Sequence, residues 1–140
     1  MPFSAHCRVG RLVEARLHAL SSVDEVDRFQ AAMREAFLLA GRKAVVCADW
    51  RGAQVLPPDV AERVAAMLVF GNPRLERSAV LLARDSAAFA LQVERVVREA
   101  ANPARRTFRD AADMQAWLSG ALDPIERTRM EEFLSESVRR

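Results

Sequence analysis

Asp49 and Arg51 are the residues whose types and spacing offer the clearest chemistry in this chain. They follow a continuous apolar run at residues 44–48, which indicates a strand buried on both faces. Asp49 would then lie at the carboxyl end of a central strand, where open α/β sheets usually bind ligands. A carboxylate and a guanidinium there could position a polar ligand or a partner. The alternative is a local salt bridge, or hydrogen bonds from loop amides to Asp49.

The residues around this pair do not indicate a catalytic centre. Catalysis by Asp49 and Arg51 would need a third group, and the sequence shows none. The two histidines, His6 and His18, have no second His or Cys at metal-ligand spacing. Glycine-rich phosphate loops, the Gly-x-Ser-x-Gly elbow and tyrosine are all missing. We therefore predict a protein that is not an enzyme and that has no metal site and no cofactor.

The composition is that of one ordinary globular domain. The chain has 140 residues, of which 51% are hydrophobic and 29% charged. The net charge of +2 comes from interspersed acids and bases, so we expect no nucleic-acid partner. No apolar run approaches the roughly 20 residues of a membrane span, and residues 1–8 lack the order of a signal peptide. We expect a cytoplasmic protein in which Cys47 is a core residue.

The first elements are a hairpin and a βαβ unit. Alternation over residues 8–20 predicts a strand near a sheet edge with Glu14 and Arg16 on its wet face, after a tight turn at Gly10. A capping box at residues 22–25 then predicts the start of a helix. Gly41 predicts its end, just before the strand at 42–49. Strand, helix and strand with short joins predict parallel pairing and a right-handed crossover.

The helix predicted at residues 58–70 is apolar almost all round, which is more than a helix covering a sheet needs. Another element or a second subunit must cover the surplus. We predict a homodimer through this helix, with the interface residues Val60, Met67, Leu68 and Phe70. Pro58 and Asp59, at its start, join Asp49 and Arg51 as candidate partner- or ligand-binding residues.

The remaining elements complete an α/β pattern. A second continuous apolar strand is predicted at 77–83, a helix begins after residues 85–86, and a short polar strand at 105–109 suits a sheet edge. Two further helices begin near residues 110 and 123. The expected fold is a single mixed, mostly parallel sheet of about five strands flanked by helices. We assign residues 1–122 to this domain and 123–140 to an additional C-terminal helix.

Several segments resemble the STAS superfamily, named for sulphate transporters and anti-sigma-factor antagonists, and especially its stand-alone bacterial members related to Sec14-like domains. The likeness covers residues 7–122 and rests on Val46-Cys47-Ala48-Asp49, on Arg77-Ser78-Ala79-Val80 and on the segment 106–118. It implies a signalling or protein-interaction role without catalysis. Antagonists of this family carry a phosphorylated serine at the start of the helix after the central strand, but here no serine occurs between Asp49 and Ser78. Asp59 would place a fixed negative charge in that region.

Two functions follow as hypotheses. The first is a non-enzymatic bacterial regulatory module that binds another protein, of unknown identity, and forms a homodimer. The alternative is a small-molecule or lipid carrier of the Sec14-like type, which needs a cavity of at least about 300 Å³ between sheet and helices. We expect Phe29, Phe37, Phe89 and Trp117 to fill a small core, which counts against the carrier. The sequence leaves open whether the last helix docks on its own domain or on a partner.

Overall fold

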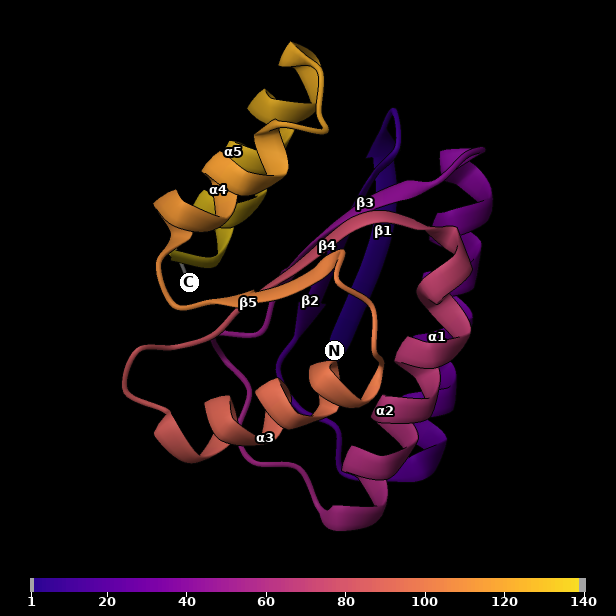
Figure 1. The fold of residues 1–140 in the computed structure, drawn as a ribbon, viewed down its shortest axis with the longest axis vertical. Helices are drawn as coiled ribbons and strands as arrows, with labels where there is room; N and C mark the ends of the chain where they lie inside the picture. The colour runs from indigo at the N-terminus through magenta and orange to yellow at the C-terminus, as the bar shows by residue number, and fades with distance from the viewer. Residues whose placement is uncertain (1, 139–140) are drawn as a thin grey trace.

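A five-stranded sheet forms the centre of the computed structural model, which describes residues 2–138 and their side chains as far as Glu136. The strands lie in sequence order across the sheet (Figure 1). Strand β1 pairs antiparallel with β2, and all other pairs are parallel. The strands are β1 (Phe3–Val9), β2 (Leu12–Leu17), β3 (Ala44–Asp49), β4 (Leu75–Leu81) and β5 (Arg105–Phe108). The predicted α/β fold with a mixed, mostly parallel sheet is confirmed.

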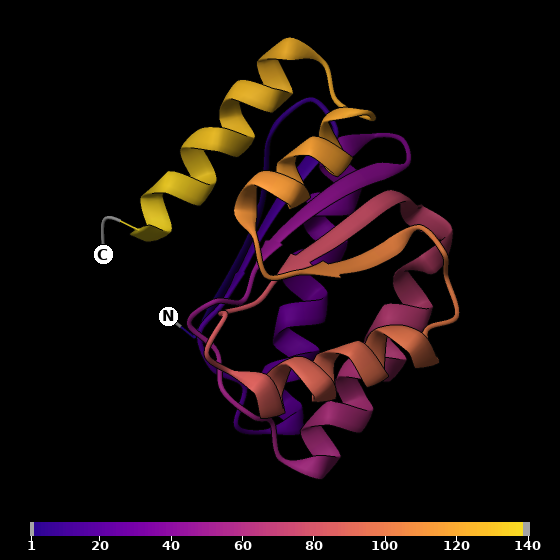
Figure 2. The same ribbon diagram turned by 60° about the vertical axis from the view of Figure 1, so that its left-hand side comes forward.

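Helices cover both faces of the sheet (Figures 1 and 2). Each parallel step from β2 to β5 returns through one helix, and right-handed crossovers in one direction place these helices on the same face. They are α1 (Val23–Ala40), α2 (Pro58–Gly71) and α3 (Ala87–Glu99), with a short 3₁₀ turn at Asn72–Arg74 before β4. The other face is covered by α4 (Ala111–Ser119) and α5 (Pro124–Val138). Because the strand order never reverses, the parallel part of the sheet has no topological switch point.

The local signals in the sequence form the expected caps and turns. The Ser22 hydroxyl accepts a hydrogen bond from the Glu25 amide at 3.2 Å, and the Glu25 carboxylate accepts one from the amide of Ser21 at 2.7 Å. Gly41 ends α1 with φ of 70°, and Gly10 turns the β1–β2 hairpin with φ of 53°. Both angles lie in the left-handed region that favours glycine.

The prediction of a wet face on β2 is wrong. Glu14 and Arg16 do alternate with apolar residues, but they are only 2% and 6% exposed. The reason is that α5 lies over this face, and β1 rather than β2 forms the edge of the sheet. Both faces of β2 are therefore buried.

Two hydrophobic clusters form the core, one on each side of the sheet. The cluster under α4 and α5 contains Cys47, whose thiol is fully buried and has its pKa raised by that burial. Cys47 is thus a core residue, as expected. Helix α5 contributes Met130, Phe133 and Leu134 to the same cluster. The last helix therefore docks on its own domain and completes its core.

Most of the apolar surface of α2 is covered by the chain itself, which corrects the predicted oligomer interface. Val60, Met67 and Leu68 are 0%, 8% and 7% exposed, because α2 packs against α1 and α3 as well as over the sheet. Of the four predicted interface residues only Phe70, at 75% exposed, presents its side chain to solvent, next to Val69 at 52%. Within residues 2–138, no helix is both long enough and apolar enough to cross a membrane.

Candidate functional site

Asp49 and Arg51 form a bidentate ion pair at the end of β3. The Arg51 Nε and Nη2 atoms donate to the two carboxylate oxygens of Asp49 at 2.9 and 3.1 Å. The Asp49 side chain is almost fully buried, and its Oδ2 also lies 3.8 Å from the Nε of Arg16. The local salt-bridge interpretation of this pair is therefore confirmed.

Both arginines continue from Asp49 to the backbone of α5. Arg51 donates through Nη2 to the carbonyl of Leu134 at 3.0 Å, and Arg16 donates through Nη2 to the carbonyl of Phe133 at 2.8 Å. The Arg16 guanidinium also lies 4.3 Å from the centre of the Phe133 ring. The carboxyl end of β3 is thus covered by α5, and the Asp49–Arg51 pair attaches this helix to the sheet.

A second set of charges holds the amino-terminal half of α5. Arg129 donates through Nε and Nη2 to the two oxygens of Glu14, both at 2.7 Å, and this pairing raises the pKa of Arg129. Glu126 accepts hydrogen bonds from the amides of Arg11 and Asp123 at 2.8 and 2.9 Å. The sequence indicated a helix start near residue 123 but not the pair of Glu14 and Arg129, because the pattern of a strand does not show which distant residue its charged side chains will meet.

Pro58 and Asp59 are exposed in the first turn of α2. The Asp59 carboxylate accepts a hydrogen bond from the amide of the next residue, Val60, at 3.0 Å, and an acid in the first turn is favourable at a helix start. This arrangement gives neither residue an evident binding role. Two of the four predicted site residues, Asp49 and Arg51, are brought together by the structure, and their ion pair attaches α5 to the sheet. Pro58 and Asp59 take no part in that ion pair.

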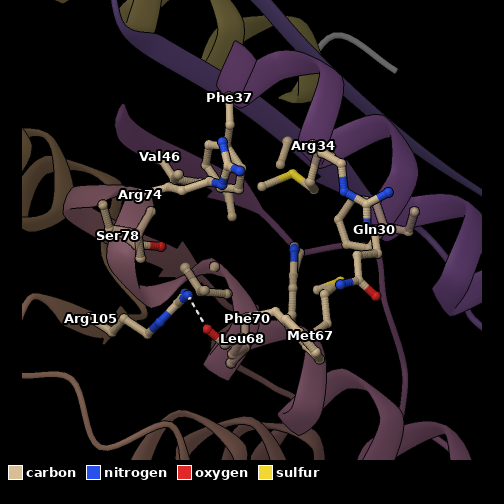
Figure 3. A pocket seen from close by; sticks show the side chains of 18 residues that line it. Gln30, Arg34, Phe37, Val46, Met67, Leu68, Phe70, Arg74, Ser78 and Arg105 are labelled. Atoms are coloured by element: carbon tan, nitrogen blue, oxygen red, sulfur yellow. Dashed lines mark hydrogen bonds between the residues drawn. The ribbon is translucent and has the colours of Figure 1, made fainter. Parts of the chain in front are cut away.

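The other face of the sheet contains a cavity of ≈160 Å³ beneath α1 and α2. Its lining comes from α1, α2, the 3₁₀ turn and strands β2 to β5. Figure 3 shows Arg74, Ser78 and Arg105 on one side of the cavity and Gln30 and Arg34 on the other. The apolar part of the lining includes Phe29, Met33, Phe37, Val46, Met67 and Leu68.

The charged groups of this cavity are all cationic. Arg34, Arg74 and Arg105 line it, and no Asp or Glu is among the described residues that do so. Arg105 donates through Nε to Asn72 and through Nη2 to the carbonyl of Leu68, both at 2.8 Å (Figure 3 shows the second bond). Burial lowers the pKa of Arg105 to about 10, so the guanidinium is still charged at neutral pH.

Trp50 adds an unpaired donor to the same lining. The residue is 3% exposed, and its indole Nε1 is buried with no hydrogen-bond partner among residues 2–138. Its ring stacks against Phe89, with 6.5 Å between the ring centres. A buried donor left without an acceptor costs about 1–3 kcal/mol.

The size of the cavity suits a small group. Its volume of ≈160 Å³ is below the minimum expected for a lipid carrier, and a cavity of about 150 Å³ accommodates one benzene ring. The four large aromatic residues do not all act as the core filling that the sequence suggested. Phe29 and Phe89 are buried in the core and Trp117 packs with Phe108 on the opposite face, as expected, but Phe37 is only partly buried and forms a wall of the cavity together with Phe29.

No family model, no curated protein and no solved structure matches this chain in the three comparisons with known proteins. The STAS resemblance therefore stays a prediction. Within the part of the chain that the structure describes, no group of three or more His, Cys, Asp or Glu residues could hold a metal ion. The cavity is the feature that sequence reasoning missed, because its cationic and unpaired groups come from distant elements with no common spacing.

Proposed function

We propose that this protein is a non-catalytic binding module whose ligand is a small molecule held in the cavity beneath α1 and α2. The observation that carries the proposal is a cavity of ≈160 Å³, large enough for one ring, whose lining combines apolar walls with three arginines and, among the described residues, no acid. The proposal keeps the carrier hypothesis but replaces the lipid by a ligand of about the size of one ring. It is also compatible with a regulatory role of the STAS kind, in which ligand occupancy would be the signal.

Access to the cavity supports this function. Arg34, Phe70 and Arg74 belong to the lining and are exposed, so the cavity reaches the surface between the two helices. The lining combines apolar walls with a few polar groups, which is typical of small-molecule sites. The Asp49–Arg51 site has no comparable free volume, since α5 occupies it.

Trp50 is a natural reporter for a binding test. The chain has two tryptophans, and Trp117 lies on the opposite face, so a Trp117→Phe background leaves Trp50 as the only indole. We expect a saturable change in Trp50 fluorescence when a panel of single-ring compounds (benzoate, benzamide and benzylamine) is titrated. At least one member of the panel should bind.

Two matched variants test whether the signal comes from the cavity. Ala48→Leu adds three carbons to the lining and should abolish binding. Ala66→Leu makes the same change at an exposed position of α2 and should leave binding unaltered. No saturable signal with any compound, or an equal signal in both variants, would contradict the proposed function.

A second candidate function is protein interaction through the ends of α1 and α2. Leu38, Leu39, Val69 and Phe70 are 65%, 72%, 52% and 75% exposed there, and the two helices lie side by side in Figure 1. A second copy of the chain is the proposed partner, which keeps the predicted homodimer but moves its interface to these residues.

Light scattering should then give twice the mass of one chain for the wild type and one chain mass for Phe70→Ser. Leu91→Ser, at an equally exposed leucine of α3, is the control, and a wild type of single-chain mass at high concentration removes this candidate.

A further inference from the structure

We propose that the ligand of the cavity is a small organic anion, in which a carboxylate or phosphate group is joined to one ring or a chain of similar size. This inference rests on the proposed function and specifies the ligand of the same site. Its basis is the charge of the lining, the fixed position of Arg105 and the volume beside it.

The cavity has a surplus of positive charge. Arg34, Arg74 and Arg105 line it, and none of them forms an ion pair within residues 2–138. The buried arginine on the other face of the sheet, Arg16, is balanced by the carboxylate of Asp49. Arg34 and Arg74 are exposed and Arg105 is partly buried, so the cost of a cation without a counter-charge falls on Arg105, and a bound anion would supply the missing charge.

Arg105 is held in one orientation by its neighbours. Asn72 accepts from the Nε of Arg105 and from the side-chain amide of Asn102, and Asn72 donates to the carbonyl of Ala100 at 2.7 Å. These bonds and the one to Leu68 occupy Nε and Nη2 of Arg105, whereas Nη1 has no hydrogen-bond partner in the described part of the chain. A guanidinium fixed in this way has little entropy to lose when its remaining N–H groups bind an anion.

The rest of the lining determines what accompanies the anionic group. The aromatic and aliphatic walls are suited to a ring or a short chain, and the volume of ≈160 Å³ is too small for the acyl chains of a lipid. Together with the arginines, these walls favour an amphipathic anion over an inorganic ion and over a neutral hydrocarbon.

Arg105 also has a structural role that the test must separate from binding. Its bond to the Leu68 carbonyl lies near the carboxyl end of α2, where a cation is favourable in itself. A purely structural Arg105 would affect the stability of the fold and would not affect a preference for one ligand charge over another. The discriminating quantity is therefore the ratio of two affinities measured on the same protein.

The experiment compares benzoate with benzamide, which has nearly the same shape but no charge. In the wild type we expect benzoate to bind at least about tenfold more tightly than benzamide, because hydrogen bonds to a charged group are the stronger ones. Arg105→Gln should lower this ratio to near one while benzamide binding stays within about twofold. Arg98→Gln, the same change at an exposed position of α3, should keep the wild-type ratio. A parallel series uses phenyl phosphate in place of benzoate. The compound that binds more tightly indicates whether the anionic group of the ligand is a phosphate or a carboxylate.

The outcomes distinguish this inference from the proposed function. If benzoate and benzamide bind equally to the wild type, the cavity is a binding site but the inference of an anionic ligand is overturned. If no compound binds, the proposed function fails as well. Should Arg105→Gln not fold, Arg74→Gln at the exposed rim replaces it, with a smaller but measurable fall in the ratio expected and an unchanged ratio counting against the inference.

Discussion

The two faces of the sheet bury charge in opposite ways. Under α5, Glu14, Arg16 and Asp49 are all more than nine-tenths buried, and each of them has an oppositely charged neighbour. Under α1 and α2, Arg105 is partly buried and, like Trp50, belongs to a lining that has no acid among the described residues. Apolar side chains fill the space under α4 and α5, where the hollow is an open one between Val9 and α5, whereas the other face contains the cavity.

This difference separates structural charge from functional charge. A buried carboxylate such as Asp49, at the end of a central strand, would ordinarily suggest an active or binding site. Here its partners lead to the carbonyls of α5, so the charges position a helix. On the other face, the arginines of the cavity lining have no carboxylate partner among the described residues, and the positioning of a helix does not explain all of them. The candidate site is therefore identified by charges that lack a partner of opposite sign, and not by the burial of charge alone.

The largest effect is expected from removing the ring that closes the α5 face. Phe133 is 3% exposed and packs in the core under Arg16, so Phe133→Ala should lower the free energy of unfolding by about 3–5 kcal/mol. Urea denaturation followed by circular dichroism measures this change. Ile125→Ala is the control on the same helix, since Ile125 is 70% exposed and its loss should cost less than about 0.5 kcal/mol. Equal effects of the two substitutions would mean that α5 does not belong to the cooperative core.

A slightly smaller effect is expected from breaking the charge balance on that face. Glu14→Ala leaves Arg129 without its bidentate partner and should lower the free energy of unfolding by about 3 kcal/mol. The double variant Glu14→Ala/Arg129→Ala should recover part of the loss, because the largely buried guanidinium is removed with its partner and the carboxylates that also faced it, Glu132 and Glu136, are at least partly exposed. Glu76→Ala removes a half-exposed carboxylate that faces Arg11 at 3.8 Å, and its cost should stay below about 1 kcal/mol. A Glu14 effect as small as that of Glu76 would show that the buried pair is not structural.

The sequence predicted the elements well because their signals are local. The capping box at Ser22, the left-handed stop at Gly41 and the continuous apolar strands are each complete within a few residues. Those signals sufficed for the α/β fold and for the position of β5 at the sheet edge. They also sufficed for the local pair of Asp49 and Arg51, which are only two residues apart.

What the sequence could not predict depends on distant partners. Alternating polar and apolar residues on β2 look the same whether the polar face meets water or a charged helix, and Arg129 lies 115 residues from Glu14. Arg105 fits the pattern of a charged edge strand, yet its guanidinium turns beneath α2. A cavity is the absence of filling side chains, and no spacing of residues encodes it.

The last and smallest effect compares the packing of the two faces directly. Ala79 of β4 and Ala48 of β3 are both buried, but Ala79 belongs to the filled cluster under α4 and α5, whereas Ala48 lines the cavity. Ala79→Leu should therefore lower the free energy of unfolding by about 1–3 kcal/mol, because its added carbons have no space. Ala48→Leu places the same carbons in free volume and should change stability by less than about 1 kcal/mol. Urea denaturation of both variants gives the comparison, and an equal cost at the two positions would mean that the cavity is closed in solution, which would remove the site on which ligand binding depends.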